Sequence, residues 1–334
     1  RNPNHRLAAF LDDGSLELIT ADDDSGMLAA TGTVGGQRVV VFASDATVMG
    51  GAMGVAGCKA VVAAYERALA DEVPIVGLWH SGGARLPEGV VSLHAVGEVF
   101  AIMTRASGTI PQISVVIGAA AGGAAYGPAL TDIVILAPEG RIFVTGPDVV
   151  RSVTGEDVDA LRLGGPEPHG RRSGVVHVLA ESTEDAFTRA GTLCTLLADQ
   201  GDFDISTMTD VDLAAQLPES AKRAYDVHPL VDELLDSGPS QELHARWAPN
   251  IVTTLGRLGG RTVGVIANNP QVGGGALSAE ACRKIVDFTV LCDSFNIPIV
   301  RLMDTPGFVV GTDAERRGAP GHIMNFMNAT CLTT

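Results

Sequence analysis

Short apolar runs alternate along this chain with longer stretches whose apolar residues recur at helical spacing. Buried strands are predicted for the apolar runs at 38–43, 74–80, 111–118, 261–267 and 298–304. Helices are predicted for the stretches at 55–70, 90–105 and 279–295. Strands that alternate with helices are typical of parallel sheets covered on both faces. The pattern therefore predicts an α/β fold.

One segment of the chain is repeated. Residues 32–83 align without a gap on residues 256–307, so each residue meets a partner 224 positions later. In each copy a strand leads into a glycine-rich loop, a helix and a second strand that ends in a glycine turn. The matches include Gly35 and Gly36 with Gly259 and Gly260, and Cys58 with Cys282. The repeat predicts two domains of similar plan, 1–205 and 241–334, joined by a linker and entry segment at 206–240.

The first copy continues beyond the repeated segment. A third strand leads into the stretch GAAAGGAAYGPAL, from Gly118 to Leu130. The corresponding stretch of the second copy is expected near position 346, which is 224 residues after Gly122 and beyond Thr334. We therefore expect the second domain to be truncated in this chain.

The net charge and the cysteine spacing indicate which partners and which kinds of site are not expected. The 334 residues carry a formal net charge of −16, and both nucleic acid and anionic membranes attract clustered Lys and Arg, so neither is expected as a partner. No signal peptide or membrane span is apparent. The five cysteines form no C-x-x-C pair and no zinc-type spacing, so we expect no metal site, no disulfide framework and a cytoplasmic location.

The glycine and alanine stretch is a candidate site although none of its side chains titrates near neutral pH. It falls where a strand meets a helix, and the first N–H groups of a helix are unpaired within it and carry the positive end of its dipole. Two such groups aimed at a carbonyl oxygen stabilise an enolate or a tetrahedral oxyanion. Gly83 and Ala84, at another strand end, are further candidate donors. Close packing of helix against strand explains the same glycines equally well.

Two other motifs do not support a catalytic role. The DTPGF motif resembles the metal-side motif of GTPases, but the chain has no G-x-x-x-x-G-K-[ST] loop to bind phosphates. His80 and Ser81 are strand neighbours and so point to opposite faces, and no G-x-S-x-G elbow surrounds the serine. We interpret them as a packed histidine and a turn serine, and Glu88, Asp132 and Asp304 as caps or solvated turn residues.

Several long motifs follow one another in a familiar order: SGGARLPEGV at 81–90, AGGAAYGPALTD at 121–132, IFVTGPDVVRSVTGEDV at 142–158, LGGPEPHGRRSGV at 163–175, and ANNP followed by DTPGF. Together they resemble the carboxyltransferase β subunit of biotin-dependent acyl-CoA carboxylases, particularly the actinobacterial acetyl- and propionyl-CoA type. The resemblance covers essentially the whole chain. It implies two tandem crotonase-like domains, each a β-β-α superhelix, in agreement with the repeat.

The resemblance also implies a reaction. CO2 passes from carboxybiotin, held on a separate carrier subunit, to the α-carbon of a short acyl-CoA such as propionyl-CoA or acetyl-CoA. In the family mechanism the biotin ureido group takes the α-proton, so no protein acid or base is required. Carried over to this chain, Gly122 and Gly123 hold the thioester oxygen of the enolate. The implied partners are a biotin carboxylase and biotin carboxyl carrier α subunit and further copies of this chain, in a homo-hexamer built as a trimer of dimers.

The resemblance assigns the acyl-CoA to the first domain and the biotin to the second. The implied substrate-binding residues are Ser81, Gly82, Gly83, Ala84, Arg85, Ala121, Ala124 and Tyr126. The implied biotin-side residues are Pro306, Gly307 and Phe308. The chain departs from the common family pattern at His80 and Pro87, where Asp and Gln are frequent. A biotin-dependent acyl-CoA decarboxylase subunit, a noncatalytic scaffold subunit and a CoA-thioester hydratase remain alternatives.

Overall fold

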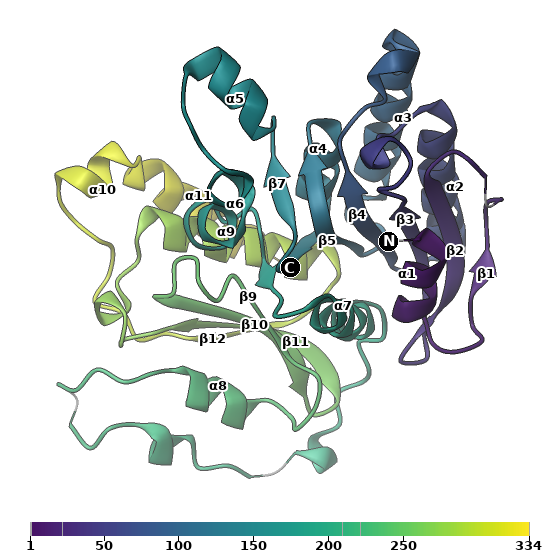
Figure 1. Ribbon diagram of the computed structural model, residues 1–334. Helices are drawn as coiled ribbons and strands as arrows, with labels where there is room; N and C mark the ends of the chain where they lie inside the picture. Colours follow the sequence, from purple (N-terminus) through teal and green to yellow (C-terminus); the bar gives the residue numbers. More distant parts are fainter. Residues whose placement is uncertain (1, 22, 209, 221, 334) are drawn as a thin grey trace. The chain divides into compact units, whose positions relative to one another are not determined.

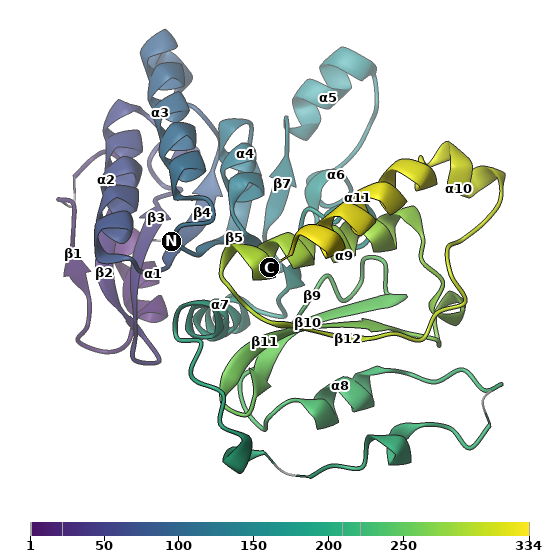
Figure 2. The same cartoon turned by 180° about the vertical axis from the view of Figure 1, so that it is seen from behind.

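The computed structural model describes residues 2–21, 23–208, 210–220 and 222–333. The chain forms two compact units, residues 1–198 and 199–334. Figures 1 and 2 show their labelled helices and strands in two views from opposite sides. Each unit contains a β-sheet with helices, which confirms the predicted α/β class. Among the helices that the structure describes, none combines the length and apolar character required to span a bilayer.

The first unit contains a mixed eight-stranded sheet. Its strands are β1 (Glu17–Leu18), β2 (Met27–Val34), β3 (Gln37–Ser44), β4 (Ile75–Ser81), β5 (Gln112–Ala121), β6 (Ile133–Leu136), β7 (Arg141–Phe143) and β8 (Val178–Leu179). Their order is β1-β2-β3-β4-β5-β6-β8, and β7 pairs with β5. Neighbours from β3 onward are parallel. The expectation of a parallel sheet is wrong for the pairs β1–β2 and β2–β3, which are antiparallel. A two-residue glycine turn joins β2 directly to β3, and so short a connection permits only antiparallel pairing.

The helices of the first unit are α1 (Pro3–Phe10), α2 (Val55–Asp71), α3 (Val90–Ala106), α4 (Gly123–Leu130), α5 (Pro147–Thr154), α6 (Ala160–Gly164) and α7 (Thr183–Ala198). Helices α2 and α3 confirm the predictions at 55–70 and 90–105. Shorter helical turns are Met49–Gly51 and Leu86–Glu88, and a π-helical segment covers Pro168–Ser173.

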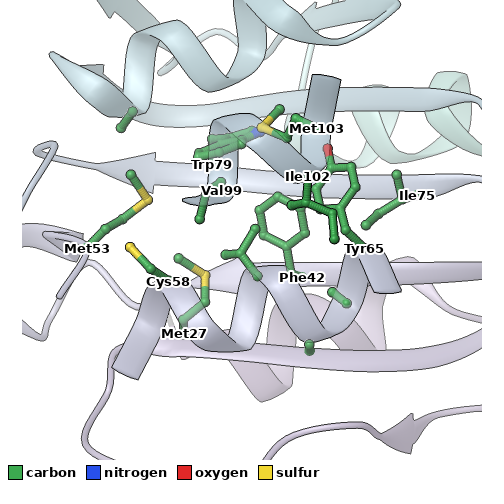
Figure 3. Packing of buried hydrophobic residues seen from close by; sticks show 14 of the residues in the cluster. Met27, Phe42, Met53, Cys58, Tyr65, Ile75, Trp79, Val99, Ile102 and Met103 are labelled. Atoms are coloured by element: carbon green, nitrogen blue, oxygen red, sulfur yellow. The ribbon is translucent and has the colours of Figure 1, made fainter. Parts of the chain in front are cut away.

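Aromatic rings pack among aliphatic side chains and methionines in the core formed by the sheet and helices α2 and α3 (Figure 3). The rings of Phe42 and Trp79 meet edge to face with centroids 5.2 Å apart, and Tyr65 lies 6.2 Å from Phe42. The Trp79 indole N–H donates to the Ser114 hydroxyl at 2.9 Å. Burying each large apolar side chain contributes about 1.5–3 kcal/mol. This packing fixes the positions of β4 and β5, whose ends carry the candidate site.

The second unit contains a four-stranded sheet of order β12-β11-β10-β9. Its strands are β9 (Gln241–Leu243), β10 (Ile251–Leu258), β11 (Arg261–Asn268) and β12 (Ile299–Leu302). Its helices are α8 (His228–Leu234), α9 (Ala279–Ser294), α10 (Thr312–Arg316) and α11 (Ala319–Leu332), and its short turns are Ile205–Thr207, Leu213–Gln216 and Gly273–Gly275. Helix α9 confirms the prediction at 279–295. Its first turn is capped by the Ser278 hydroxyl, which accepts the Ala281 N–H at 3.1 Å.

The repeat detected in the sequence is also a repeat of structure. Strands β2 and β10 begin and end 224 residues apart, and so do β3 and β11. The pairing registers match too, since Met27 lies opposite Ser44 and Ile251 lies opposite Asn268. The two glycine-rich loops have the same backbone, with φ of 66° at Gly50 and 67° at Gly274. The repeated segment therefore has the same local structure in both units.

Candidate functional site

The turn between β5 and α4 leaves backbone N–H groups unpaired. Gly122 has φ 56° and ψ −128°, a conformation that favours glycine. The carbonyl of Gly122 accepts the N–H groups of Ala125 and Tyr126, at 2.9 and 3.3 Å, which starts the helix. Within the described part of the chain, the N–H groups of Gly123 and Ala124 have no acceptor. Two donors therefore remain available at the positive end of α4.

The N–H of Gly122 itself is paired. It donates to the carbonyl of Phe143 on β7 at 3.2 Å, and Ala121 lies opposite Phe143 in the parallel pairing of β5 with β7. Gly122 thus shapes the turn and fastens it to β7. The N–H groups that this turn leaves without an acceptor are those of the next two residues, the half-buried Gly123 and the buried Ala124.

A second turn follows β4. The N–H of Gly82 donates to the Gly50 carbonyl at 3.0 Å, and the N–H of Gly83 donates to the Ser81 hydroxyl at 3.3 Å. The N–H of Arg85 donates to the Met53 carbonyl at 2.9 Å. No described residue accepts the N–H of Ala84. This turn therefore contributes one further available donor.

The two turns meet at the same edge of the sheet. Strands β4 and β5 are parallel neighbours, with Ser81 opposite Ala120, and Figure 1 shows both leading toward α4. A Cβ on Gly83 would lie 2.8 Å from the Ala121 carbonyl oxygen and 3.8 Å from the Gly123 nitrogen. Only glycine permits this approach, since φ of Gly83 is also 100°. The structure thus brings together the Ser81–Arg85 and Ala121–Ala124 turns that the sequence singled out.

The side chain of Arg85 has a structural role, as a brace between the Ser25 carbonyl and Glu88. One of its Nη atoms donates to the Ser25 carbonyl at 2.9 Å, and the other lies 3.4 Å from Glu88. Glu88 in turn accepts the N–H of Val55, the first residue of α2, at 2.7 Å, so its interpretation as a cap is confirmed. Asp132 likewise accepts the N–H of Gln112 at 2.8 Å, and burial raises its pKa to about 6.

His80 and Ser81 do not form a nucleophile and base pair. The Nδ1 atom of His80 lies 3.2 Å from Nη2 of Arg6, and because a guanidinium only donates, this nitrogen is the acceptor. The imidazole ring covers Gly118, where a Cβ would come within 2.4 Å of it. Arg6 is buried, which lowers its pKa, and it also donates to the Ser44 carbonyl at 2.7 Å. Sequence analysis missed Arg6, which holds the histidine before the turn.

Tyr126 stands on α4 one turn after the glycines and is 44% exposed. Its ring lies 6.3 Å from that of Phe100 on α3. Ala124 is fully buried and Ala121 is half-buried. The edge of the site therefore combines backbone donors with one exposed aromatic ring.

The second unit repeats the β4 turn after β12. The N–H of Leu277 donates to the Gly307 carbonyl at 2.9 Å, and the N–H of Val309 donates to the Leu277 carbonyl at 2.9 Å. The equivalent bonds in the first unit join Met53 to the Gly83 carbonyl and Arg85 to the Met53 carbonyl. Gly307 has φ 117°, and Thr305 accepts its N–H at 3.1 Å as Ser81 does in the first copy.

The biotin-side residues expected from the sequence lie on this second turn. Pro306 is exposed, and Phe308 is 37% exposed with its ring 6.4 Å from that of Phe326. The N–H of Phe308 has no acceptor among the described residues, as is true of its counterpart Ala84. Asp304, just before the turn, accepts the Tyr225 hydroxyl at 3.0 Å.

Metal and thiol chemistry find little support in these units. Across the described ranges, no group of three or more His, Cys, Asp or Glu side chains is arranged to hold a metal ion. The repeat-related cysteines Cys58 and Cys282 are buried, and burial raises the pKa of each thiol to about 11. Both remain neutral near pH 7 and are poor nucleophiles. Backbone donors are thus the main chemical feature of the site.

Known proteins show the same sequence pattern. The model of a family described as the carboxyl transferase domain matches residues 16–333. The chain is 58% identical over 327 residues to the biotin-dependent acetyl-/propionyl-coenzyme A carboxylase beta6 subunit of Mycobacterium tuberculosis. It is 56% identical over 330 residues to the propionyl-CoA carboxylase beta chain of Rhodococcus erythropolis. Each alignment covers 96% of this chain and 69% of the relative.

Solved structures share the fold. A transcarboxylase 12S structure, described as a hexamer assembly with methylmalonyl-coenzyme A and methylmalonic acid bound, matches with a TM-score of 0.94 at 35% identity. That match covers 100% of this chain and 69% of the other. A single-chain, multi-domain long-chain acyl-CoA carboxylase matches with a TM-score of 0.89 at 27% identity, over 100% of this chain and 36% of the other. These likenesses confirm the crotonase-like fold.

Proposed function

The chain belongs to the carboxyl transferase family, and from this membership we propose that it transfers CO2 from carboxybiotin, held on a separate carrier subunit, to the α-carbon of propionyl-CoA or acetyl-CoA. The names of the Mycobacterium and Rhodococcus relatives support this substrate class. The observation that carries the proposal is the meeting of two turns, after β4 and β5, with unpaired N–H groups at one edge of the sheet.

These N–H groups have a definite task in such a reaction. Removal of the α-proton of a thioester places negative charge on its carbonyl oxygen, and preorganised donors stabilise that charge. We assign this role to the N–H groups of Gly123 and Ala84, with Ala124 as a neighbouring donor and Gly122 as the residue that shapes the turn. Loss of one such donor costs about 2.7–4 kcal/mol of transition-state stabilisation.

The remaining side chains of the two turns fit a site without a protein acid or base. Ser81 accepts a backbone N–H, Arg85 braces the Ser25 carbonyl, and His80 accepts from Arg6. When bound, carboxybiotin supplies both the CO2 and the group that takes the α-proton. The chain needs only to orient the thioester and hold its oxygen. Ala121 and Tyr126 then form the surrounding walls, while the buried Ser81 and the paired N–H of Gly82 shape the turn after β4.

We assign the biotin side of the reaction to the second unit. The turn at Pro306, Gly307 and Phe308 repeats the hydrogen bonds of the acyl-CoA turn and leaves the Phe308 N–H available. A donor there suits the ureido carbonyl of biotin. The proposed partner is a biotin carboxylase and biotin carboxyl carrier subunit.

The proposed assembly is a homo-hexamer, and the description of the transcarboxylase 12S relative as a hexamer assembly supports six subunits. The proposed compartment is the cytoplasm. All five cysteines are free thiols, four of them buried, which suits reducing conditions.

The experiment supplies the full-length protein with biotin carboxylase, biotinylated carrier, ATP and bicarbonate. Acetyl-, propionyl- and longer acyl-CoAs are then compared for carboxylated product. We expect methylmalonyl-CoA or malonyl-CoA to form, with the short acyl-CoAs preferred. If none of these acyl-CoAs is carboxylated while the carrier is shown to carry carboxybiotin, the proposal is wrong and a noncatalytic role takes its place.

A further inference from the structure

A lysine is buried in the second unit with backbone carbonyls as its partners. Lys284, on α9, is 0% exposed. Its ammonium group donates to the carbonyls of Ile251, His244 and Trp247 at 2.5, 2.9 and 3.1 Å, and the carbonyl of Ala248 lies 3.5 Å away. Burial lowers the pKa of this lysine to about 7, because an ammonium group loses its water there. The carbonyl contacts offset the cost of this desolvation.

Three of the four carbonyls belong to one strained loop, residues 244–250, between β9 and β10. His244 and Ala248 have φ of 57° and 45°, in the left-handed region that residues other than glycine rarely adopt. Such conformations persist only where the surroundings fix them. Three of the carbonyls that Lys284 binds come from this loop, and the fourth is that of Ile251, at the start of β10. Lys284 therefore ties together the carbonyls at both ends of the loop from one buried point.

The loop in turn supports the glycine-rich segment that contacts the biotin-side turn. The side chain of Asn250 donates to the Ala276 carbonyl at 2.6 Å, and the Asn250 carbonyl accepts the N–H of Asn269 at 2.9 Å. The next residue, Leu277, makes both backbone bonds to the turn, one to Gly307 and one from Val309. An unbroken series of hydrogen bonds and covalent links joins Lys284 to the turn that ends β12.

In the first unit a different side chain binds the carbonyl of the equivalent loop. The residue 224 positions before Lys284 is Ala60, which has no group to bind carbonyls. There the equivalent loop is held by Arg85, which donates to the Ser25 carbonyl at 2.9 Å. The counterpart of Arg85 in the second unit is the apolar Val309. In each copy a cationic side chain thus binds this loop, from the buried Lys284 on α9 in the second unit and from the half-buried Arg85 after β4 in the first.

We infer that Lys284 is a positioning residue for the turn at Pro306–Phe308, acting through the loop at 244–250 and the Asn250 contact with Ala276. The role of that turn in binding biotin rests on the proposed function. The link from Lys284 to the turn is a property of the fold and can be measured without catalysis.

The test compares two variants of the full-length protein by amide hydrogen exchange. Lys284→Met removes the ammonium group and keeps the length of the side chain. Val265→Ala, in the buried core of β11, is the control for general destabilisation of the same unit. We expect the N–H groups of Leu277 and Val309 to exchange at least about tenfold faster in Lys284→Met than in Val265→Ala. Met53 and Arg85, the matched positions of the first unit, serve as internal controls and should not change.

Equal exchange at Leu277 and Val309 in the two variants would overturn the inference. If Lys284→Met does not fold, Asn250→Ala cuts the same connection one step later with the lysine in place, and the same outcomes apply. In the transfer assay, Lys284→Met should raise the KM for the carboxylated carrier and leave the KM for acyl-CoA unchanged. A wild-type protein without transfer activity would refute the proposed function, and the exchange result would still decide the role of Lys284.

Discussion

Asp12 in the first unit and Asp236 in the second lie 224 residues apart and make the same two hydrogen bonds. Asp12 accepts the N–H groups of the glycine pair 35–36, both at 2.9 Å. Asp236 accepts those of the pair 259–260, at 3.0 and 2.7 Å. Each carboxylate closes the hairpin turn of its unit, between β2 and β3 or between β10 and β11. The repeat therefore begins well before residue 32 and includes α1 and α8.

Replacing either aspartate by alanine should loosen its hairpin. Asp12→Ala leaves two turn N–H groups without their acceptor and should lower the free energy of unfolding by about 1 kcal/mol, since both groups are partly solvated. The backbone N–H of Gly36 holds the pKa of Asp12 below its usual value. The stabilisation that the Asp12 carboxylate provides is fully present above its pKa in the unfolded protein. It is lost as the pH falls through its lower pKa in the folded protein. Urea unfolding measures the loss of stability, and Asp13→Ala, at the exposed neighbouring residue, is the control. Equal losses in the two variants would contradict the role of Asp12 in the hairpin turn.

The extent of the repeat shows what the sequence could reveal. The apolar strands and glycine turns of residues 32–83 carry enough identity to align with 256–307. The earlier part, with LDDG at 11–14 and LDSG at 235–238, is a short signal outside any apolar run. Its meaning depends on a turn more than twenty residues later, and an aspartate beside glycine is common in ordinary turns. Only the paired structures show that these aspartates are equivalent.

The candidate site was predictable in kind but not in detail. Glycines at two strand ends indicate turns with free N–H groups, and parallel pairing brings such ends together. The sequence could not show that the N–H of Gly122 is taken by Phe143, because that bond depends on β7 returning to pair with β5. Nor could it show that Arg85 is a brace. A side chain's partner depends on tertiary packing that no local pattern records.

Gly83 and Gly82 offer a matched pair of variants. A Cβ on Gly83 would lie 2.8 Å from the Ala121 carbonyl oxygen, and its φ of 100° disfavours any side chain, so Gly83→Ala should displace the Ala84 donor. We expect kcat for acyl-CoA carboxylation to fall at least about 100-fold, as for loss of one oxyanion donor. Gly82→Ala places its Cβ at an ordinary 3.6 Å from the Gly50 carbonyl and should keep most activity. Equal activities of the two variants would argue against this turn as the site.

Gly123 tests the other turn. A Cβ on this residue would lie 3.2 Å from Cγ1 of Val96, so the larger Gly123→Val should push the start of α4 away from the β4 turn. We expect a fall of about 100-fold or more in kcat with the circular dichroism of the folded protein unchanged. Gly97→Ala, on neighbouring α3 with open space around its Cβ, is the control. Normal turnover by a folded Gly123→Val protein would refute the role of this turn.

His228 should make the stability of the second unit depend on pH. Its Nε2 lies 3.3 Å from Glu242 and its Nδ1 lies 2.5 Å from Asp226. Glu242, with Asp226, raises the pKa of His228 to about 9. A raised pKa stabilises the folded protein fully below the unfolded value, near 6.5, and this contribution is lost as the pH rises through about 9. The excess of the wild-type thermal midpoint over that of His228→Gln should therefore shrink as the pH rises from 6 to about 9.5, because only the contribution of His228 differs between the two proteins. A difference that stays constant over this range would show that His228 does not stabilise the second unit in this way.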